Sequence, residues 1–177
     1  DSPVFSDAAQ FLAWKPKSTD DDSPKLKAIQ LYQNLLNFHT EDDDRSAWID
    51  ADLERLKFGN NFAFGEEKNA RYKAALKRLA EAHADHAISS RALNYLARVV
   101  QGEGDLVKAR QIALQGRNRF PNSFGGRMCH NLIEEIEAPN SQISTERVWN
   151  DPLPNIDVRY KNLTKVYFLS LIHISEP

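Results

Sequence analysis

Residues that could carry out chemistry are few in this chain and lie apart from one another. His83 and His86 come three positions apart at the end of a predicted helix, close to Glu81 and Asp85. These side-chain types bind zinc, but helical zinc motifs use histidines four positions apart with a glutamate on the same helix. We therefore expect no metal here and interpret both histidines as favourable partners of the negative end of the helix.

The single cysteine, Cys129, directly precedes His130. Adjacent residues point to different faces of a helix, so these two cannot form a local nucleophile–base pair. One cysteine also excludes an internal disulfide framework. We predict that Cys129 is a buried structural thiol.

Two further motifs admit a structural interpretation. Gly125 and Gly126 precede Arg127 and could form an anion site at a helix N-terminus, but no strand precedes them, and we predict a tight turn between helices. The acidic run 41–44 lacks the alternating ligands and glycine of a calcium loop. We expect it to be a solvated loop in which Asp43 or Asp44 caps the next helix.

The sequence therefore predicts no catalytic, cofactor-binding or metal-binding residues, and a protein that is not an enzyme. Asn162-Leu163-Thr164 has the letters of a glycosylation sequon, a pattern with a high false-positive rate.

Composition narrows the classes of protein further. The 177 residues are 41% hydrophobic and 27% charged, with a formal net charge of −2, which is typical of a soluble globular chain. No large basic field is available for a phosphate backbone, so we expect no nucleic-acid partner. No apolar run approaches the roughly 20 residues of a membrane span. The chain begins at Asp1 without a signal-like segment, which we interpret as processing or excision from a longer chain.

The elements that position these residues are mainly helices, and the clearest is a helical hairpin over Ala92–Pro121. Small and apolar residues recur there with the spacing of a tetratricopeptide unit, a 34-residue pair of antiparallel helices. They are Leu93, Leu96, Ala97, Val100, Ala109, Ala113 and Gly116. Gly102, Gly104 and Asp105 provide the reversal, since glycine accepts positive φ and aspartate caps the following helix.

Other helices are predicted on both sides of this hairpin. The first is a short helix within 1–16, capped by Ser6 or Asp7, with Phe5, Ala8, Ala9, Leu12 and Ala13 at helical spacing. The others cover Pro24–Phe38 after Ser23, a segment ending at Phe58 with Gly59-Asn60-Asn61 as its stop, Glu66–Ala84, and a last helix beginning at Pro121. Their predicted apolar faces comprise Ala28, Ile29, Tyr32, Leu35 and Leu36; Trp48, Ile49, Leu53 and Leu56; and Met128, Leu132, Ile133 and Ile136. Phe62, Ala63 and Phe64 are expected to pack beneath a turn at Gly65.

The helices repeat in part. Ala75, Leu79 and Ala82 precede Ala109, Ala113 and Gly116 by 34 residues, as Phe62 and Ala63 precede Leu96 and Ala97. One step further back the spacing fails, which indicates an insertion around 41–50. We predict irregular tetratricopeptide-like hairpins of the right-handed α-solenoid type.

A truncated antiparallel β segment is predicted to follow the helices. Ser141–Trp149 and Asn155–Tyr160 have strand composition, Lys161-Asn162 is a plausible turn, and Lys165–Phe168 is a third strand. The predicted organisation is a helical domain over 1–138 and an incomplete β domain over 139–168. Leu169–Pro177 matches the translation of a sequencing adaptor, and we interpret 169–177 as an artefact, the alternative being a genuine strand.

Two segments carry a family resemblance. The hairpin continuing into Arg119–Glu137, and then Ile143–Arg147 followed by Ile156–Phe168, resemble in this order the amino-terminal part of large bacterial alpha-2-macroglobulin-like proteins. The resemblance implies a helical region ahead of the first macroglobulin domain, a β-sandwich, in a broad-range protease trap of the bacterial cell envelope, either periplasmic or outer-membrane-associated. Its partners would be the remaining macroglobulin domains and, through the parent protein, proteases.

The resemblance does not extend to the trapping chemistry. Cys129 is not followed by the Leu-Glu-Gln of the family's thioester motif, so the segment would act as a docking or spacing module. The alternative is a freestanding tetratricopeptide adaptor with a peptide-binding groove. A polar groove lined by residues such as Asn94 and Arg98 would favour the adaptor.

Overall fold

The computed structural model describes residues 3–20, 22–145 and 156–167. The chain divides into two compact units, residues 1–133 and 134–177, which are treated separately below. The fold is mainly helical with one two-stranded antiparallel sheet, which confirms the predicted class.

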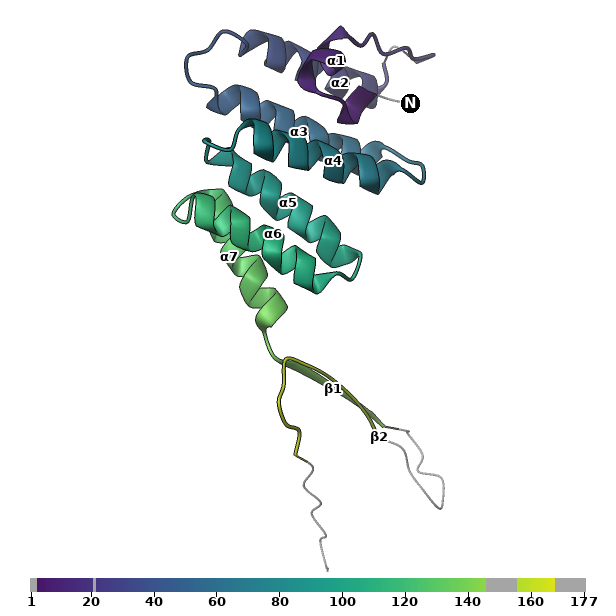
Figure 1. The fold of residues 1–177 in the computed structure, drawn as a ribbon. Coiled ribbons are helices and arrows are strands. Elements are labelled where there is room, and N and C mark those ends of the chain that lie inside the picture. Colours follow the sequence, from purple (N-terminus) through teal and green to yellow (C-terminus); the bar gives the residue numbers. More distant parts are fainter. Residues whose placement is uncertain (1–2, 21, 146–155, 168–177) are drawn as a thin grey trace, which may run out of the picture. The chain divides into compact units, whose positions relative to one another are not determined.

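Seven α-helices and one 3-10 turn form the described helical part (Figure 1). They are η1 (Pro3–Phe5), α1 (Ala8–Ala13), α2 (Pro24–Phe38), α3 (Ser46–Phe62), α4 (Lys68–Ala82), α5 (Ile88–Gly102), α6 (Leu106–Arg119) and α7 (Phe124–Glu137). Helices α3 to α6 lie side by side as two hairpins, α3–α4 and α5–α6.

The predicted hairpin over Ala92–Pro121 is confirmed as α5–α6. All seven small or apolar residues of its pattern are buried. A Cβ placed on Gly116 would lie 3.2 Å from Leu93 Cβ and 3.3 Å from the Ser90 carbonyl oxygen, so the two backbones approach closely there. At the reversal, Gly104 has φ +91° and the Asp105 carboxylate accepts a 2.9 Å hydrogen bond from the Lys108 amide, as the sequence predicted.

The predicted 34-residue spacing holds only in part. Ala75 and Leu79 are buried like Ala109 and Ala113, but Ala82 is exposed where Gly116 is buried, and Phe62 is 48% exposed where Leu96 is buried. The buried residues recur with longer spacings. Ile49, Leu53, Leu56 and Gly59 correspond to Ser90, Asn94, Ala97 and Val100, 41 positions later, and Tyr72, Leu76 and Leu79 to Ala109, Ala113 and Gly116, 37 positions later.

Helix α3 continues through Gly59-Asn60-Asn61, so the predicted stop at these residues is wrong. Gly59 is buried because η1 packs on it: a Cβ there would lie 3.0 Å from side-chain atoms of Val4 and Phe5. The glycine permits close packing instead of ending the helix. The predicted packing of Phe62 and Phe64 is also wrong, since Phe64 is 95% exposed, although Gly65 has the positive φ of a turn.

Gly125 and Gly126 lie in the first turn of α7 and not in a turn between helices. A Cβ on Gly125 would come within 2.4 Å of the Arg91 amide nitrogen, and one on Gly126 within 2.0 Å of the Phe120 carbonyl oxygen. Both glycines are therefore fixed by close backbone contacts. Ser123 accepts a 2.9 Å hydrogen bond from the Gly126 amide and caps the helix.

The apolar faces of the flanking helices are confirmed in large part. Ile49, Leu53 and Leu56 of α3, Leu36 of α2, and Leu132, Ile133 and Ile136 of α7 are buried; Ala28, Ile29, Tyr32, Trp48, Ala63 and Met128 are half-buried. Leu35 is 36% exposed, which corrects its predicted burial. In α1 the cap is Asp7, whose carboxylate accepts from the Gln10 amide at 2.8 Å.

The N-terminal segment is attached to α3 by Arg55. This side chain is fully buried, and its Nε donates to Asp52 Oδ1 at 2.8 Å. Its Nη1 donates to the Val4 carbonyl at 3.0 Å, and the guanidinium lies over the Phe11 ring at 4.5 Å. The buried ion pair thus joins three elements.

In the second unit, β1 (Asn140–Thr145) pairs with β2 (Ile156–Lys161) in antiparallel register, Ile143 opposite Val158. Asn162, with φ 56°, donates from Nδ2 to the Ile136 carbonyl at 2.8 Å, in agreement with the predicted turn. Residues 165–167 are not a strand, which corrects the third predicted strand. The predictions for 146–149, Asn155, Phe168 and 169–177 fall outside the described residues.

Candidate functional site

The helical unit has a polar groove formed by α3, α4, α5 and the start of α7. It has a volume of about 290 Å³ and is lined by Lys57, Asn60, Asn61, Tyr72, Asn94, Tyr95, Arg98, Val99 and Met128. Amides, two phenols and two cationic side chains on helices can bind a polar chain such as a peptide backbone. This groove includes Asn94 and Arg98, the two residues that the sequence predicted for an adaptor groove.

Asn94 is the most deeply placed polar residue of this groove. It is 1% exposed, and its Nδ2 is closed off from solvent, so the open part of the groove does not reach this donor. The Asn94 amide lies beside the Cys129 thiol, whose pKa it lowers against the larger effect of burial.

Ion pairs between α3 and α5 hold the groove walls in place. Arg91 of α5 donates to Glu54 at 2.8 Å and also contacts Asp50. Glu54 accepts two hydrogen bonds from Lys57 Nζ, at 2.7 and 2.9 Å. Desolvation, the largest single influence, would lower the pKa of Lys57, but the hydrogen bonds and charge interactions with Glu54 and Tyr95 together outweigh it and the pKa is raised. Lys57 is thus a fixed cation at the groove edge.

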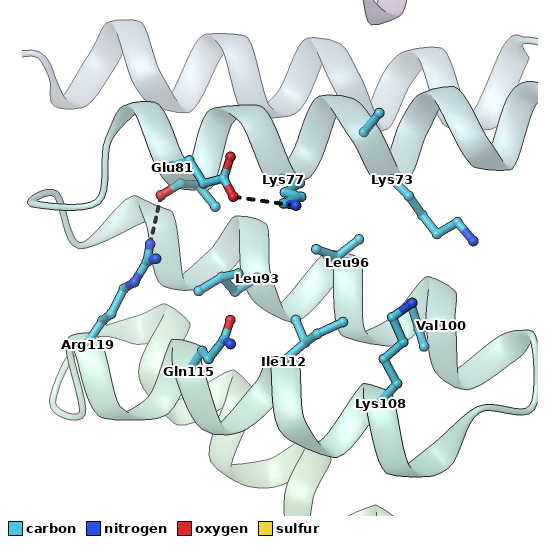
Figure 2. A pocket seen from close by; sticks show the side chains of 12 residues that line it. Lys73, Lys77, Glu81, Leu93, Leu96, Val100, Lys108, Ile112, Gln115 and Arg119 are labelled. Carbon is cyan, nitrogen blue, oxygen red and sulfur yellow. Dashed lines mark hydrogen bonds and ion pairs between the residues drawn. The ribbon is translucent and has the colours of Figure 1, made fainter.

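A second groove lies between α4 and α6 and has α5 as its floor (Figure 2). It encloses about 370 Å³. Leu93, Leu96, Val100 and Ile112 form the apolar surface, and Lys73, Lys77, Glu81, Lys108, Gln115 and Arg119 surround it. The sequence alone does not indicate this groove, because its rim comes from two helices that the whole of α5 separates in the chain.

The histidines predicted near the end of α4 are structural. The His86 Nδ1 accepts from the Ile88 amide at 3.2 Å, which leaves Nε2 as the donor to Ser46 Oγ at 3.0 Å. His83 packs edge-on against Trp48, with ring centroids 5.8 Å apart. Burial lowers the pKa of His83, so the neutral ring is favoured and the predicted charge–dipole interaction is not its role. Over the described ranges, no three His, Cys, Asp or Glu side chains gather as metal ligands.

The remaining motifs lie where a structural interpretation puts them. Cys129 is buried and donates to the Ser90 carbonyl with an Sγ–O distance of 3.4 Å, while His130 is exposed on another face. Burial raises the pKa of the Cys129 thiol to about 11, so it is a poor nucleophile at neutral pH. The acidic run is exposed. Asp44 accepts from the Ser46 amide at 2.9 Å, and its hydrogen bonds to Ser46 lower its pKa.

Comparison with known proteins identifies no relative. No family model matches the chain, and neither the curated proteins nor the solved structures contain a significant match. None of the helices in the described ranges has the length and apolar character needed to cross a membrane. The class of the protein is therefore the one its fold defines, helical hairpins with a small antiparallel sheet.

Proposed function

We propose that this chain is a non-catalytic docking and spacing module that precedes the macroglobulin domains of a bacterial alpha-2-macroglobulin-like protease inhibitor. The docking role depends on one observation, the two open grooves on a rigid pair of helical hairpins. The parent class depends on the sequence resemblance. Its expected order, helical hairpins before antiparallel strands, agrees with the order of α3–α7, β1 and β2.

The physical basis of a docking role is the separation of framework from surface. Leu53, Leu56, Leu76, Ala92 and Leu93 belong to one continuous core, which fixes the backbone of each groove wall. Charged side chains at the groove edges, such as Lys77 and Lys108, are exposed on this framework and lie outside the core. Such a surface binds a partner with little ordering cost.

Protease inhibition would belong to the parent protein in the cell envelope and not to this segment. We expect the purified chain to leave the cleavage rates of a panel of endopeptidases unchanged on a protein substrate. The coding DNA beyond Phe168 is expected to continue into a long β-rich reading frame. A chain that slows several endopeptidases at micromolar concentration would contradict the proposed division of labour.

The polar groove favours a second candidate, a freestanding tetratricopeptide-like adaptor. Lys57, Asn60 and Arg98 line this groove. A stop codon soon after Phe168, together with binding of a peptide that is lost in Arg98→Glu, would support the adaptor in place of the inhibitor module.

A further inference from the structure

We propose that the groove between α4 and α6 binds an extended acidic segment of a partner protein, in which aliphatic residues lie between glutamates or aspartates. The proposal deepens the docking function and rests on it, but it concerns a different surface from the polar groove. Figure 2 shows the arrangement, with aliphatic side chains in the middle and charged ones around them.

The floor of the groove has space for aliphatic side chains. Leu93, Leu96 and Val100 contribute only the small exposed parts of buried side chains, and Ile112 is half-buried beside them. A ligand that covers these atoms would remove apolar surface from water at roughly 25 cal/mol per Å². The space suits one or two aliphatic side chains.

The rim is predominantly cationic, from both helices that form it. Helix α4 contributes Lys73, Lys77 and Glu81, and α6 contributes Lys108 and Arg119. Lys73 is neutralised by Glu103 at 2.6 Å, and Lys77 lies 3.8 Å from Glu81, a weak exposed pair.

Two rim cations have no carboxylate partner within the described residues. Arg119 donates to the Ala80 carbonyl at 2.7 Å, which satisfies one N–H but not the charge, and the Lys108 side chain makes no ion pair in that part of the chain. They lie at opposite ends of the groove in Figure 2. Carboxylates on both sides of an aliphatic pair would complement them.

Groove length suits an extended ligand. The span from Lys73 to Glu81 along α4 is roughly 12 Å at 1.5 Å per residue. That length corresponds to about four residues of extended chain, of which alternate side chains face the same side.

The test is fluorescence polarisation with the intact chain and a labelled peptide in which two leucines, separated by one serine, lie between pairs of glutamates, since alternate side chains of an extended chain face the same side. Matched peptides replace the glutamates by lysines or the leucines by serines. We expect the acidic leucine peptide to bind at least about tenfold more tightly than either, with affinity falling as salt rises.

Charge reversal locates the site. Lys108→Glu and Lys77→Glu change exposed side chains and are expected to weaken the acidic peptide at least about fivefold, while Lys108→Glu improves binding of the lysine peptide. The matched control Lys17→Glu makes the same charge change in an exposed loop and is expected to have no effect. Circular dichroism and thermal unfolding confirm that the variants fold.

Equal binding of all three peptides, equal loss in Lys17→Glu, or no binding at millimolar peptide would overturn the proposal. Binding of decanoate without the peptide would also overturn it and assign the groove to a lipid carboxylate. None of these results predicts the outcome of the protease panel or the reading frame beyond Phe168. The experiments therefore test the docking surface and the proposed function separately.

Discussion

The two helical hairpins have the same architecture, but residues of different size fill the space between their helices. In α5–α6 the seam consists of Ala109, Ala113 and Gly116, and the helix backbones come into near contact. In α3–α4 the corresponding positions are Tyr72, Leu76 and Leu79, whose side chains fill the space between the helices. In the α3–α4 hairpin a buried ion pair, Asp52–Arg55, also attaches the N-terminal segment.

The difference shows that one arrangement of helices tolerates two solutions to packing. Small residues allow close backbone contact, whereas large residues keep the helices apart and hold the interior by side-chain volume. Substitutions that add atoms should therefore destabilise the hairpin with the close seam, α5–α6. Substitutions that remove atoms or contacts should destabilise the hairpin filled by large side chains, α3–α4.

The largest effect is expected from Arg55→Met in the α3 hairpin. The substitution leaves Asp52 buried without a partner and removes the donor to the Val4 and Ser6 carbonyls. We expect a loss of about 3–5 kcal/mol in the free energy of unfolding, measured by urea denaturation. The double variant Asp52→Leu with Arg55→Met should recover much of this loss, and a single-variant loss below about 1 kcal/mol would argue against an anchoring role.

The close seam of α5–α6 should be broken by Gly116→Ala. The added methyl group would lie 2.5 Å from Cys129 Sγ, so either helix α6 or α7 must shift, at a cost of about 1–3 kcal/mol. Adding Cys129→Ala makes room, so the double variant should cost less than the sum of the single ones in the same urea assay. Strict additivity would mean that the two side chains do not compete for space.

Acid should destabilise the α3–α4 hairpin through His83. Burial lowers the pKa of His83 in the folded state, so the unfolded chain binds the proton more readily. The contribution of neutral His83 to the free energy of unfolding is fully present above the pKa of the unfolded chain, about 6.5, and is lost as the pH falls toward the lower pKa of the folded state. Urea titrations at pH 7.5 and 5.5 should show a smaller difference for His83→Gln than for the unsubstituted chain, by a fraction of a kcal/mol. The α5–α6 hairpin contains no histidine.

A pair of effects with opposite sign is expected at the reversal between α5 and α6. Gly102 has open space around its Cβ position and ordinary φ, so Gly102→Ala should stabilise by up to about 1 kcal/mol. Gly104 also has open space, but its φ of +91° makes Gly104→Ala destabilising by about 1–2 kcal/mol. Thermal unfolding of both variants separates backbone conformation from packing, and equal shifts would contradict the role of positive φ.

The sequence by itself determined the features that depend on local spacing. The pattern from Leu93 to Gly116 predicts the α5–α6 hairpin, because small residues at helical spacing leave few alternatives. Asp7, Gly104 and Asp105 were found for the same reason, since capping and positive φ are properties of a few adjacent residues. The burial of Cys129 likewise followed from its place on an apolar helix face.

Only the tertiary structure decided what depends on contacts distant in sequence. Gly59, Gly125 and Gly126 resemble chain breaks by residue type, yet each allows another segment's backbone or side chains to approach a helix. The grooves also depend on contacts distant in sequence, since Lys73 and Lys108 line one groove only after α4 and α6 pack on α5. A glycine or lysine has the same local propensity in either setting, and the packing partner decides its role.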